Sequence, residues 1–268
     1  MAEPAVTPQA DVPTTDAPTE GRRLGREALL MLVVPPVVVL VVFGAWVWWW
    51  QTAELDVIES NQLRWSEVST LIVQHMKLTV VTAVIVVVIA VPLGVILTRR
   101  AFRAAAPVVV GIANAGQAAP SVGLIVLLFL WLNDWLSGFW IAVVALSLYG
   151  ILPVLRNTIT GIDGVDPTLV EAGRGVGMTT MGTLFRIELQ LALPVIMAGV
   201  RTSLVLVVGT ASLACFINAG GLGEMIVTGI TLFKYSLMIS GALLVALLAL
   251  VFEWLGRVLE QLTRPRGV

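Results

Sequence analysis

Six long apolar segments, separated by polar and charged stretches, set the pattern of this chain. They cover residues 28–50, 77–98, 107–132, 138–155, 191–217 and 235–254. Each segment is near the ~20 residues that an α-helix needs to cross the hydrocarbon core of a bilayer. We therefore expect an all-α integral membrane protein with about six transmembrane helices.

Arginine residues gather in the segments that would share one side of the membrane. Because basic loops stay in the cytoplasm, both chain termini are expected there. Tryptophans end the first apolar segment and surround the turn at Asn133 and Asp134, which marks the outer interface. The arginines are Arg22, Arg23, Arg26, Arg99, Arg100, Arg103, Arg156, Arg174, Arg186, Arg257, Arg264 and Arg266.

The N-terminal residues differ in composition from the rest of the chain. Residues 1–20 are rich in Ala, Pro, Thr and acidic side chains, so we expect a disordered cytoplasmic tail over 1–27 and a transmembrane domain over 28–268. The first apolar segment resembles the core of a signal peptide. However, it is longer than the roughly 7–15 residues of such a core and ends in tryptophans, so we expect it to stay as a helix.

The composition excludes several classes of protein. The chain is 58% hydrophobic and 12% charged, with a net charge of −1, which leaves no basic field for nucleic acid. Its single cysteine, Cys215, excludes an intramolecular disulfide and a cysteine-based metal cluster, and no metal site is expected. The single histidine, His75, is expected to be structural and to lie at a membrane edge.

Ionisable residues are nearly absent from the middles of the apolar segments. The exceptions, Glu188 and Arg201, lie near the cytoplasmic entry to the fifth segment. Intramembrane charge usually marks ion and proton pathways, so an ion-driven transporter and an intramembrane enzyme are both disfavoured. The chain has no G-x-x-x-x-G-K-[ST] loop. Energy for uphill transport would therefore come from another chain.

Two polar groups within this apolar pattern suggest a path and a gate. The third segment carries Asn114, Gln117 and Ser121 around Pro120, which predicts a helix that lines a translocation path, or one that forms interhelical hydrogen bonds. After the fifth segment, the glycine-rich residues 218–224 predict a sharp bend. This bend is interpreted as a gate element or as an ordinary outer loop.

A segment that mixes charge, glycine and helical periodicity stands between the fourth and fifth apolar segments. Asp166 and Pro167 form a helix-start signal, because Asp caps free amides and Pro suits the first turn. Glu171 and Arg174 then fall on the polar side of the helix, and Gly177 can end it in a left-handed conformation. The apolar positions at helical spacing are Leu169, Ala172, Gly173 and Val176.

A second helix is expected after this glycine. Thr179 can cap it, and Leu184, Ile187 and Leu191 lead it into the fifth apolar segment. A helix–glycine–helix hairpin over about 163–190 is a shape that a partner protein can hold. An ordinary cytoplasmic connector is the alternative.

The spacing within this hairpin resembles the cytoplasmic signature of ABC-importer permease subunits, which is E-A-A, three residues, G, nine residues, I, one residue, L-P. Residues 148–158, 165–167 and 193–199 further resemble the glycine betaine/carnitine/choline (osmoprotectant) branch, as do residues 114–121 and 220–223. The resemblance covers about residues 71–262. The signature positions are Glu171, Ala172, Gly177, Ile187 and Leu189.

The resemblance implies the type I ABC importer permease fold, in a binding-protein-dependent importer of the prokaryotic plasma (inner) membrane. The implied substrates are quaternary-ammonium compatible solutes such as glycine betaine, choline or carnitine. The implied partners are ABC ATPase subunits that bind ATP and Mg, a second permease subunit in a homo- or heterodimer, and a separate extracytoplasmic solute-binding protein. The chain itself is implied to bind no cofactor and to be no enzyme.

The resemblance also implies two groups of functional residues. Aromatic cages for quaternary ammonium groups should belong to the binding protein, so a neutral path is expected in the permease. The ATPase-coupling residues are Glu171, Ala172, Gly173, Arg174, Gly177, Met178 and Thr179. The residues of the path or gate are Asn114, Gln117, Pro120, Ser121, Tyr149, Asn218, Gly220 and Gly221.

The sequence leaves two alternative functions open, and it departs from the family signature at two positions. The alternatives are an importer of another small zwitterionic or amino-acid-like solute, and an ATP-independent channel or scaffold subunit. Gly173 replaces the second alanine of the signature, and Gln190 stands in place of its proline. Both changes predict altered docking to the ATPase, because glycine lowers helix propensity and the loss of proline restores an amide donor.

Overall fold

This computed structural model describes residues 23–263, with their side chains over 30–261, and the described part contains helices and no strands. The α-helices are α1 (Arg23–Thr52), α2 (Val57–Gln62), α3 (Trp65–Thr98), α4 (Ala106–Ala118), α5 (Ser121–Leu132), α6 (Gly138–Asp163), α7 (Pro167–Gly175), α8 (Thr180–Thr183), α9 (Leu189–Ala211), α10 (Gly223–Thr231) and α11 (Tyr235–Thr263). The all-α prediction is therefore confirmed.

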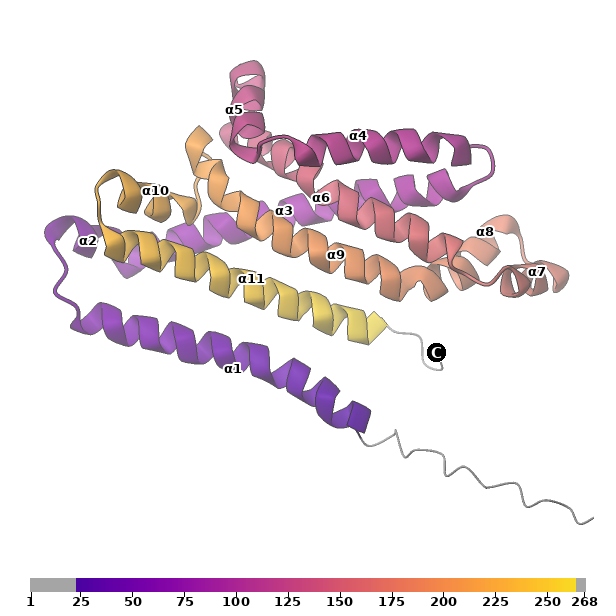
Figure 1. Cartoon of the computed structure of the whole chain (residues 1–268), viewed down its shortest axis with the longest axis horizontal. Coiled ribbons are helices and arrows are strands. Elements are labelled where there is room, and N and C mark those ends of the chain that lie inside the picture. The colour runs from indigo at the N-terminus through magenta and orange to yellow at the C-terminus, as the bar shows by residue number, and fades with distance from the viewer. Residues whose placement is uncertain (1–22, 264–268) are drawn as a thin grey trace, which may run out of the picture.

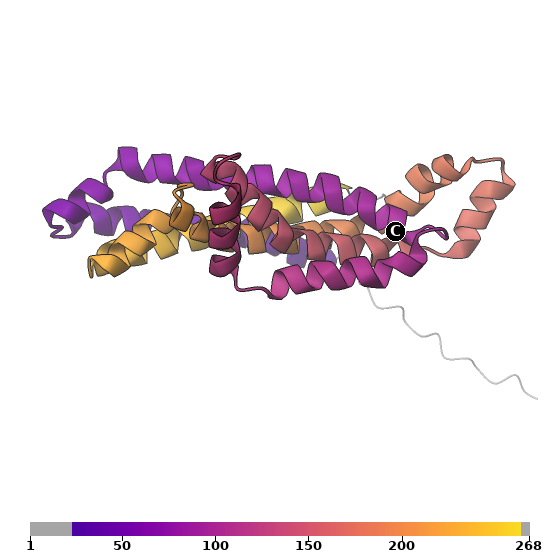
Figure 2. The ribbon, with the colours of Figure 1, turned by 90° about the horizontal axis from the view of Figure 1, so that it is seen from above.

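The long helices run side by side along one axis of the molecule (Figure 1). Helix α6 packs against α3 and α9, α9 packs against α11, and α1 lies outermost against α11. Helices α7 and α8 extend beyond the bundle at one end, whereas α2 and α10 lie at the other end (Figure 2). The start of α1 and the end of α11 lie toward the end that carries α7 and α8.

The expected number of membrane spans fits the structure. Five described helical segments are long and apolar enough to cross a membrane, and the count is six if the bent pair α4–α5 forms one span. The first of them begins inside α1, which starts at Arg23 and so within the tail expected over 1–27. The rest of that tail, residues 1–22, lies outside the described part of the chain.

The third apolar segment is not the single helix over 107–132 that its composition predicts. It is broken after Ala118, and the axes of α4 and α5 meet at 98°. Ala119, which precedes Pro120, is extended with φ −65° and ψ 143°, since the proline ring disfavours a helical conformation in the preceding residue. Proline also lacks the amide that would continue the helix.

The second apolar segment starts earlier than the sequence predicts. Helix α3 begins at Trp65 instead of residue 77, because neither glycine nor proline interrupts residues 65–91. Its 34 residues make a rod of about 51 Å, longer than the ~30 Å hydrocarbon core. Residues 65–76 therefore belong to the same continuous helix as the predicted span.

His75 lies in the protein core, between α3 and α9. Its side chain is buried, and its Nε2 is 3.0 Å from the carbonyl oxygen of Val208 in α9. This contact joins α3 to α9, which agrees with the structural role expected for the residue.

Candidate functional site

The hairpin between α6 and α9 begins at the helix start that the sequence predicts. The Asp166 carboxylate accepts a hydrogen bond of 2.9 Å from the Thr168 amide, and Pro167 is the first residue of α7. The same bond holds the pKa of Asp166 below its usual value. The carboxylate is therefore ionised, and it faces the free amides at the start of the helix.

The hairpin turns at Gly177, which has a φ of 89°. Two hydrogen bonds close the turn: the Met178 amide donates to Gly173 O at 3.0 Å, and the Gly177 amide donates to Arg174 O at 2.9 Å. This pattern is a Schellman motif, in which glycine takes the left-handed position. The Thr179 hydroxyl then accepts a hydrogen bond of 3.1 Å from the Gly182 amide and caps α8. The predicted helix–glycine–helix geometry is confirmed.

The second arm of the hairpin runs into α9 without a break. Between α8 and α9 the chain forms a π-helical turn over Leu184–Glu188, a type of turn that is frequent at functional sites. Gln190 lies in the first turn of α9, where the signature has proline and where the helix here continues. The turn places Glu188 toward the end of α3.

Several apolar side chains of the hairpin are exposed to solvent, although Leu184 is buried. Val176 is 82% exposed and Met181 67% exposed, and Leu169 and Phe185 are exposed beside them. We call these four residues the apolar stripe. A loop that bound no partner would lower its free energy by burying such side chains, so the stripe has the character of a contact surface.

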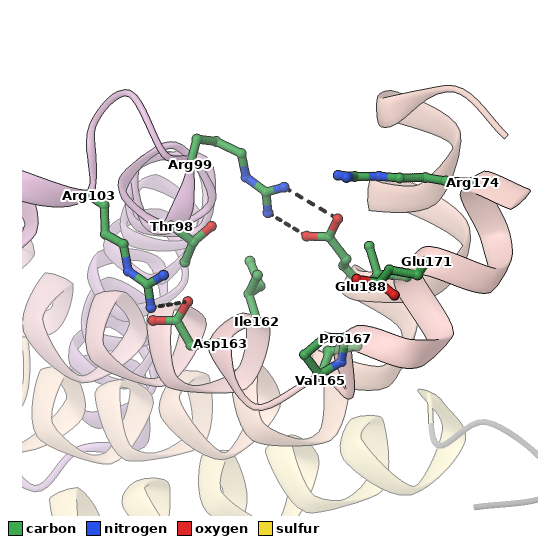
Figure 3. A pocket seen from close by; sticks show the side chains of 11 residues that line it. Thr98, Arg99, Arg103, Ile162, Asp163, Val165, Pro167, Glu171, Arg174 and Glu188 are labelled. Atoms are coloured by element: carbon green, nitrogen blue, oxygen red, sulfur yellow. Dashed lines mark hydrogen bonds and ion pairs between the residues drawn. The ribbon is translucent and has the colours of Figure 1, made fainter.

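The polar side of α7 faces a pocket of 440 Å³ between the hairpin and the ends of α3 and α6. Glu171 and Arg174 line this pocket, and Arg174 points across it toward Arg99 and Glu188 (Figure 3). The other lining residues are Thr98, Arg103, Ile162, Asp163, Val165, Pro167 and Val170.

Two ion pairs connect the elements around the pocket. The Arg99 guanidinium at the end of α3 donates to both oxygens of Glu188, at 2.5 and 3.3 Å, and the Glu188 side chain is only 7% exposed. Arg103 lies 3.5 Å from Asp163 at the end of α6, in a more exposed position. The Arg99–Glu188 pair restricts the relative position of its two elements more strongly, because Glu188 is buried and two hydrogen bonds join the side chains.

Gly173 has a packing role that its position in the signature does not reveal. It is buried, and a Cβ atom there would lie 2.5 Å from Ile187 Cδ1 and 3.2 Å from Met178 Sδ. The missing methyl group lets α7 approach the π-helical turn closely. Gly173 therefore faces the interior of the hairpin, toward Ile187 and Met178.

The predicted path residues around the break between α4 and α5 are held by α6. The Tyr149 hydroxyl donates to Ala119 O at 2.7 Å, so the carbonyl at the break is satisfied. Arg156 Nη2 lies 3.4 Å from Asn114 Oδ1, and Asn114 is exposed. Gln117, Pro120 and Ser121 lie on either side of the same break.

The predicted gate residues are held by α3. Asn218, Gly220 and Gly221 all have positive φ, at 56°, 81° and 98°. The Gly221 amide donates to Gln74 Oε1 at 3.0 Å, and a Cβ on Gly220 would lie only 2.3 Å from that oxygen. The turn over residues 218–221 is thus a tight backbone bend against α3, separate from the break that Tyr149 holds.

Sequence reasoning predicted Asn218 and Gly220 but missed the other residues around them, which come from three parts of the chain. A pocket of 250 Å³ lies beside the glycine-rich turn. The residues that line it are Gln74, Lys77, Phe139, Asn218, Ala219, Gly220 and Glu224. No periodic pattern in the sequence brings the residues of this pocket together. By contrast, Glu188 of the hairpin pocket can be recognised in the sequence as a carboxylate in an apolar region. Among the described residues, no cluster of His, Cys, Asp or Glu could hold a metal ion.

Comparison with known proteins agrees with this arrangement. Residues 90–265 match the model of the family described as binding-protein-dependent transport system inner membrane component. The chain is similar to the permease protein OpuCB of the glycine betaine/carnitine/choline transport system of Bacillus subtilis (strain 168), with 40% identity over 195 residues, 73% of this chain and 88% of that protein. It is 38% identical over 203 residues to the osmoprotectant import permease protein OsmW of Salmonella typhimurium, covering 75% and 93%.

Among solved structures, the fold is similar to a chain of the MetNI methionine ABC transporter in an inward-facing conformation. The TM-score is 0.65 at 21% identity, over 74% of this chain and 96% of that chain. The protein is thus a multi-pass membrane protein with the type I ABC importer permease fold. By the match over most of its length, the chain belongs to the family of binding-protein-dependent transport system inner membrane components.

Proposed function

We propose that this chain is the permease subunit of an ATP-driven importer of quaternary-ammonium compatible solutes such as glycine betaine, choline or carnitine. The observation that carries the proposal is the hairpin, which extends beyond the bundle and exposes the apolar stripe at one end. Relatives at about 40% identity are permeases of glycine betaine, carnitine and choline systems, which supports this solute class over amino acids. The methionine transporter resembles this chain at only 21% identity.

The proposed assembly places the hairpin in the cytoplasm, on ABC ATPase subunits that bind ATP and Mg. Both chain termini would share that side, because the described ends of α1 and α11 lie toward the hairpin end. This chain supplies the membrane path and no catalytic group. A second permease subunit and a separate extracytoplasmic solute-binding protein complete the importer.

The coupling step follows from the contacts of the hairpin. Closure of the ATPase moves the apolar stripe, and the coupling residues between Glu171 and Thr179 move with it. The Arg99–Glu188 pair transfers this movement to α3, and the Arg103–Asp163 pair transfers it to the α6 end. Such a rigid-body shift between packed helices is an ordinary way to alternate access to a membrane path.

The proposed path passes the break between α4 and α5 and the glycine-rich turn. Tyr149 holds the first of these, and Gln74 holds the second. Because α6 carries Tyr149 and α3 carries Gln74, movement of these two helices would act on both places. The residues assigned to the path or gate are Asn114, Gln117, Pro120, Ser121, Tyr149, Asn218, Gly220 and Gly221.

Reconstitution of the assembled importer tests the proposal. The wild-type transporter should hydrolyse ATP faster when glycine betaine and its binding protein are present. Glu171→Arg adds a fourth cation to a pocket that holds Arg99, Arg103 and Arg174, so it should remove most of this stimulation. Glu54→Arg, at an exposed site on the α2 side, is the matched control and should keep it.

Two results would overturn the proposal. Stimulated hydrolysis that is unchanged in Glu171→Arg would contradict the coupling role of the hairpin. Downhill solute flux through the permease without any ATPase subunit would instead indicate a channel. Stimulation by an amino acid but by no quaternary-ammonium solute would keep the importer and change its solute class.

A further inference from the structure

The pocket beside the glycine-rich turn contains charges of both signs around one aromatic ring. Lys77 comes from α3, Phe139 from the start of α6, and Glu224 from the first turn of α10. Its volume of 250 Å³ lies below the roughly 300–1,000 Å³ of pockets for drug-sized ligands. A small solute is therefore the class of ligand that fits.

The two charged groups of this pocket are not paired with each other. Lys77 and Glu224 form no ion pair within the described part of the chain, in contrast with Lys234 and Asp56 nearby. Burial raises the pKa of Glu224, which is the effect of a carboxylate that has lost water without gaining a cation. A ligand cation beside Glu224 would supply the missing partner.

Phe139 presents its face to the pocket. The Lys77 ammonium lies 5.3 Å from the centroid of the ring, a distance at which the ring attracts a cation. Quaternary ammonium groups are bound by aromatic faces in the same way. A ligand carboxylate could bind Lys77 and draw it away from the Phe139 ring. The face of the ring would then be free to bind the quaternary ammonium group of the ligand.

The pocket also lies at the gate. Gly220 and Asn218 form part of its wall, and the Gly221 amide is bonded to Gln74, which also lines the pocket. Lys77 stands where the apolar part of α3 begins. A solute in this pocket would therefore lie at the boundary between the outer interface and the hydrocarbon core, next to the turn over residues 218–221.

We infer that this pocket is a transient binding site for a small zwitterionic solute with a quaternary ammonium group, at the mouth of the path. Lys77 binds the carboxylate of the solute, and Phe139 and Glu224 receive its ammonium group. The site replaces the neutral path that the sequence predicts with one that has a charge for each end of the solute. This inference rests on the proposed function and adds a solute site within the permease itself.

The test compares two solutes that differ in one group. Glycine betaine carries a carboxylate where choline carries a hydroxyl, and both carry the quaternary ammonium. In the assembled importer in proteoliposomes, with both solutes supplied through saturating binding protein, Lys77→Gln should lower the ratio of glycine betaine to choline transport about tenfold. Glu224→Gln should slow both solutes, by about fivefold, and leave the ratio unchanged.

Matched variants separate a solute contact from a structural effect. Lys77→Arg keeps the charge and should keep the ratio near the wild-type value. Lys234→Gln and Glu67→Gln change the same residue types at the same end but outside the pocket, and they should change neither rate. If Lys77→Gln does not assemble with the ATPase, Lys77→Met provides a second neutral variant for the same comparison.

The outcomes are distinguishable. Equal loss of both solutes in Lys77→Gln, or no loss of either, overturns the solute site and leaves the proposed importer intact. A wild-type importer that moves neither glycine betaine nor choline overturns the proposed solute class, and this inference with it. A lower ratio in Lys77→Gln together with an unchanged ratio in Lys77→Arg is the result expected from the geometry.

Discussion

The pocket at the hairpin and the pocket at the glycine-rich turn hold their charges in different ways. At the hairpin end, Arg99 binds both oxygens of the buried Glu188, and Arg103 lies beside Asp163. At the other end, Lys77 faces an aromatic ring, and the carboxylate of Glu224 has no basic partner in the described part of the chain.

In the proposed importer, this difference would distinguish a site that transmits movement from a site that binds the solute. A bidentate ion pair fixes the relative position of two elements, so a movement of the hairpin reaches α3 without slack. A charged side chain that has no ion-pair partner in the protein can instead form an ion pair with a ligand. Three variants test this contrast, and they follow from the largest expected effect to the smallest.

Val176→Asp tests whether the apolar stripe is the docking surface. Placing a carboxylate in an apolar interface costs its desolvation, so the amount of ATPase that co-purifies with the permease should fall at least about tenfold. Val57→Asp is the matched control, because Val57 is 76% exposed on α2 at the opposite end. Equal ATPase retention in the two variants would show that the stripe is not the contact.

Glu188→Gln tests the transmission. The variant leaves the Arg99 guanidinium without its carboxylate, and we expect a loss of about 1–3 kcal/mol in stability because Arg99 is itself 30% exposed. The number of solutes moved per ATP should fall about fivefold, since docking survives while α3 is released.

The control for this variant breaks an ion pair between two residues of the same helix. Glu253→Gln removes the partner of Arg257 four residues away. This change should cost only about 0.3–0.5 kcal/mol in stability and leave the number of solutes moved per ATP unchanged. A double variant of Arg99→Gln and Glu188→Gln should lose less than the sum of the two single losses. Additive losses would contradict a direct role of the pair.

The smallest effect is expected at the contact of Lys234 with Asp56, which ties the start of α2 to the start of α11. The amide of Glu59 and the Lys234 ammonium keep the pKa of Asp56 below its usual 3.8. Asp56 is therefore ionised and paired with Lys234 above pH 3.8. The ion pair is lost as the pH falls through the lowered pKa of Asp56. Because both groups are exposed, only the distance between spin labels on α2 and α11 should increase at acidic pH, and Asp56→Asn should show the increase at pH 7.

Much of the hairpin was predictable because its signals are local. The cap at Asp166, the left-handed glycine at position 177 and the cap at Thr179 each depend on residues within a few positions, and the structure confirms all three. The direction of its faces was not predictable. Helical spacing separates an apolar side from a polar side, but packing against the rest of the chain decides which side chains are exposed.

The remaining features depend on contacts between distant segments. The bend at Pro120 follows from a local rule. Its angle depends on packing, because α4 packs against α6, and α5 packs against both α6 and residues 212–217. The pocket around Lys77 joins residues from α3, α6 and α10, and no spacing in the sequence brings them together. The Arg99–Glu188 pair likewise joins residues 89 positions apart.

The length of α3 has a mechanical consequence for the importer. One helix carries Lys77 at the outer pocket and Arg99 at the hairpin, about 33 Å apart along its axis. Pro92 removes one hydrogen bond from the ladder between them, so bending stiffness is lowest there. Because about 22 Å of straight helix separates Pro92 from Lys77, a change of about 10° at Pro92 displaces Lys77 by about 4 Å. In the proposed importer, a small change of angle at the hairpin end of α3 would thus displace Lys77 at the outer pocket by several ångströms.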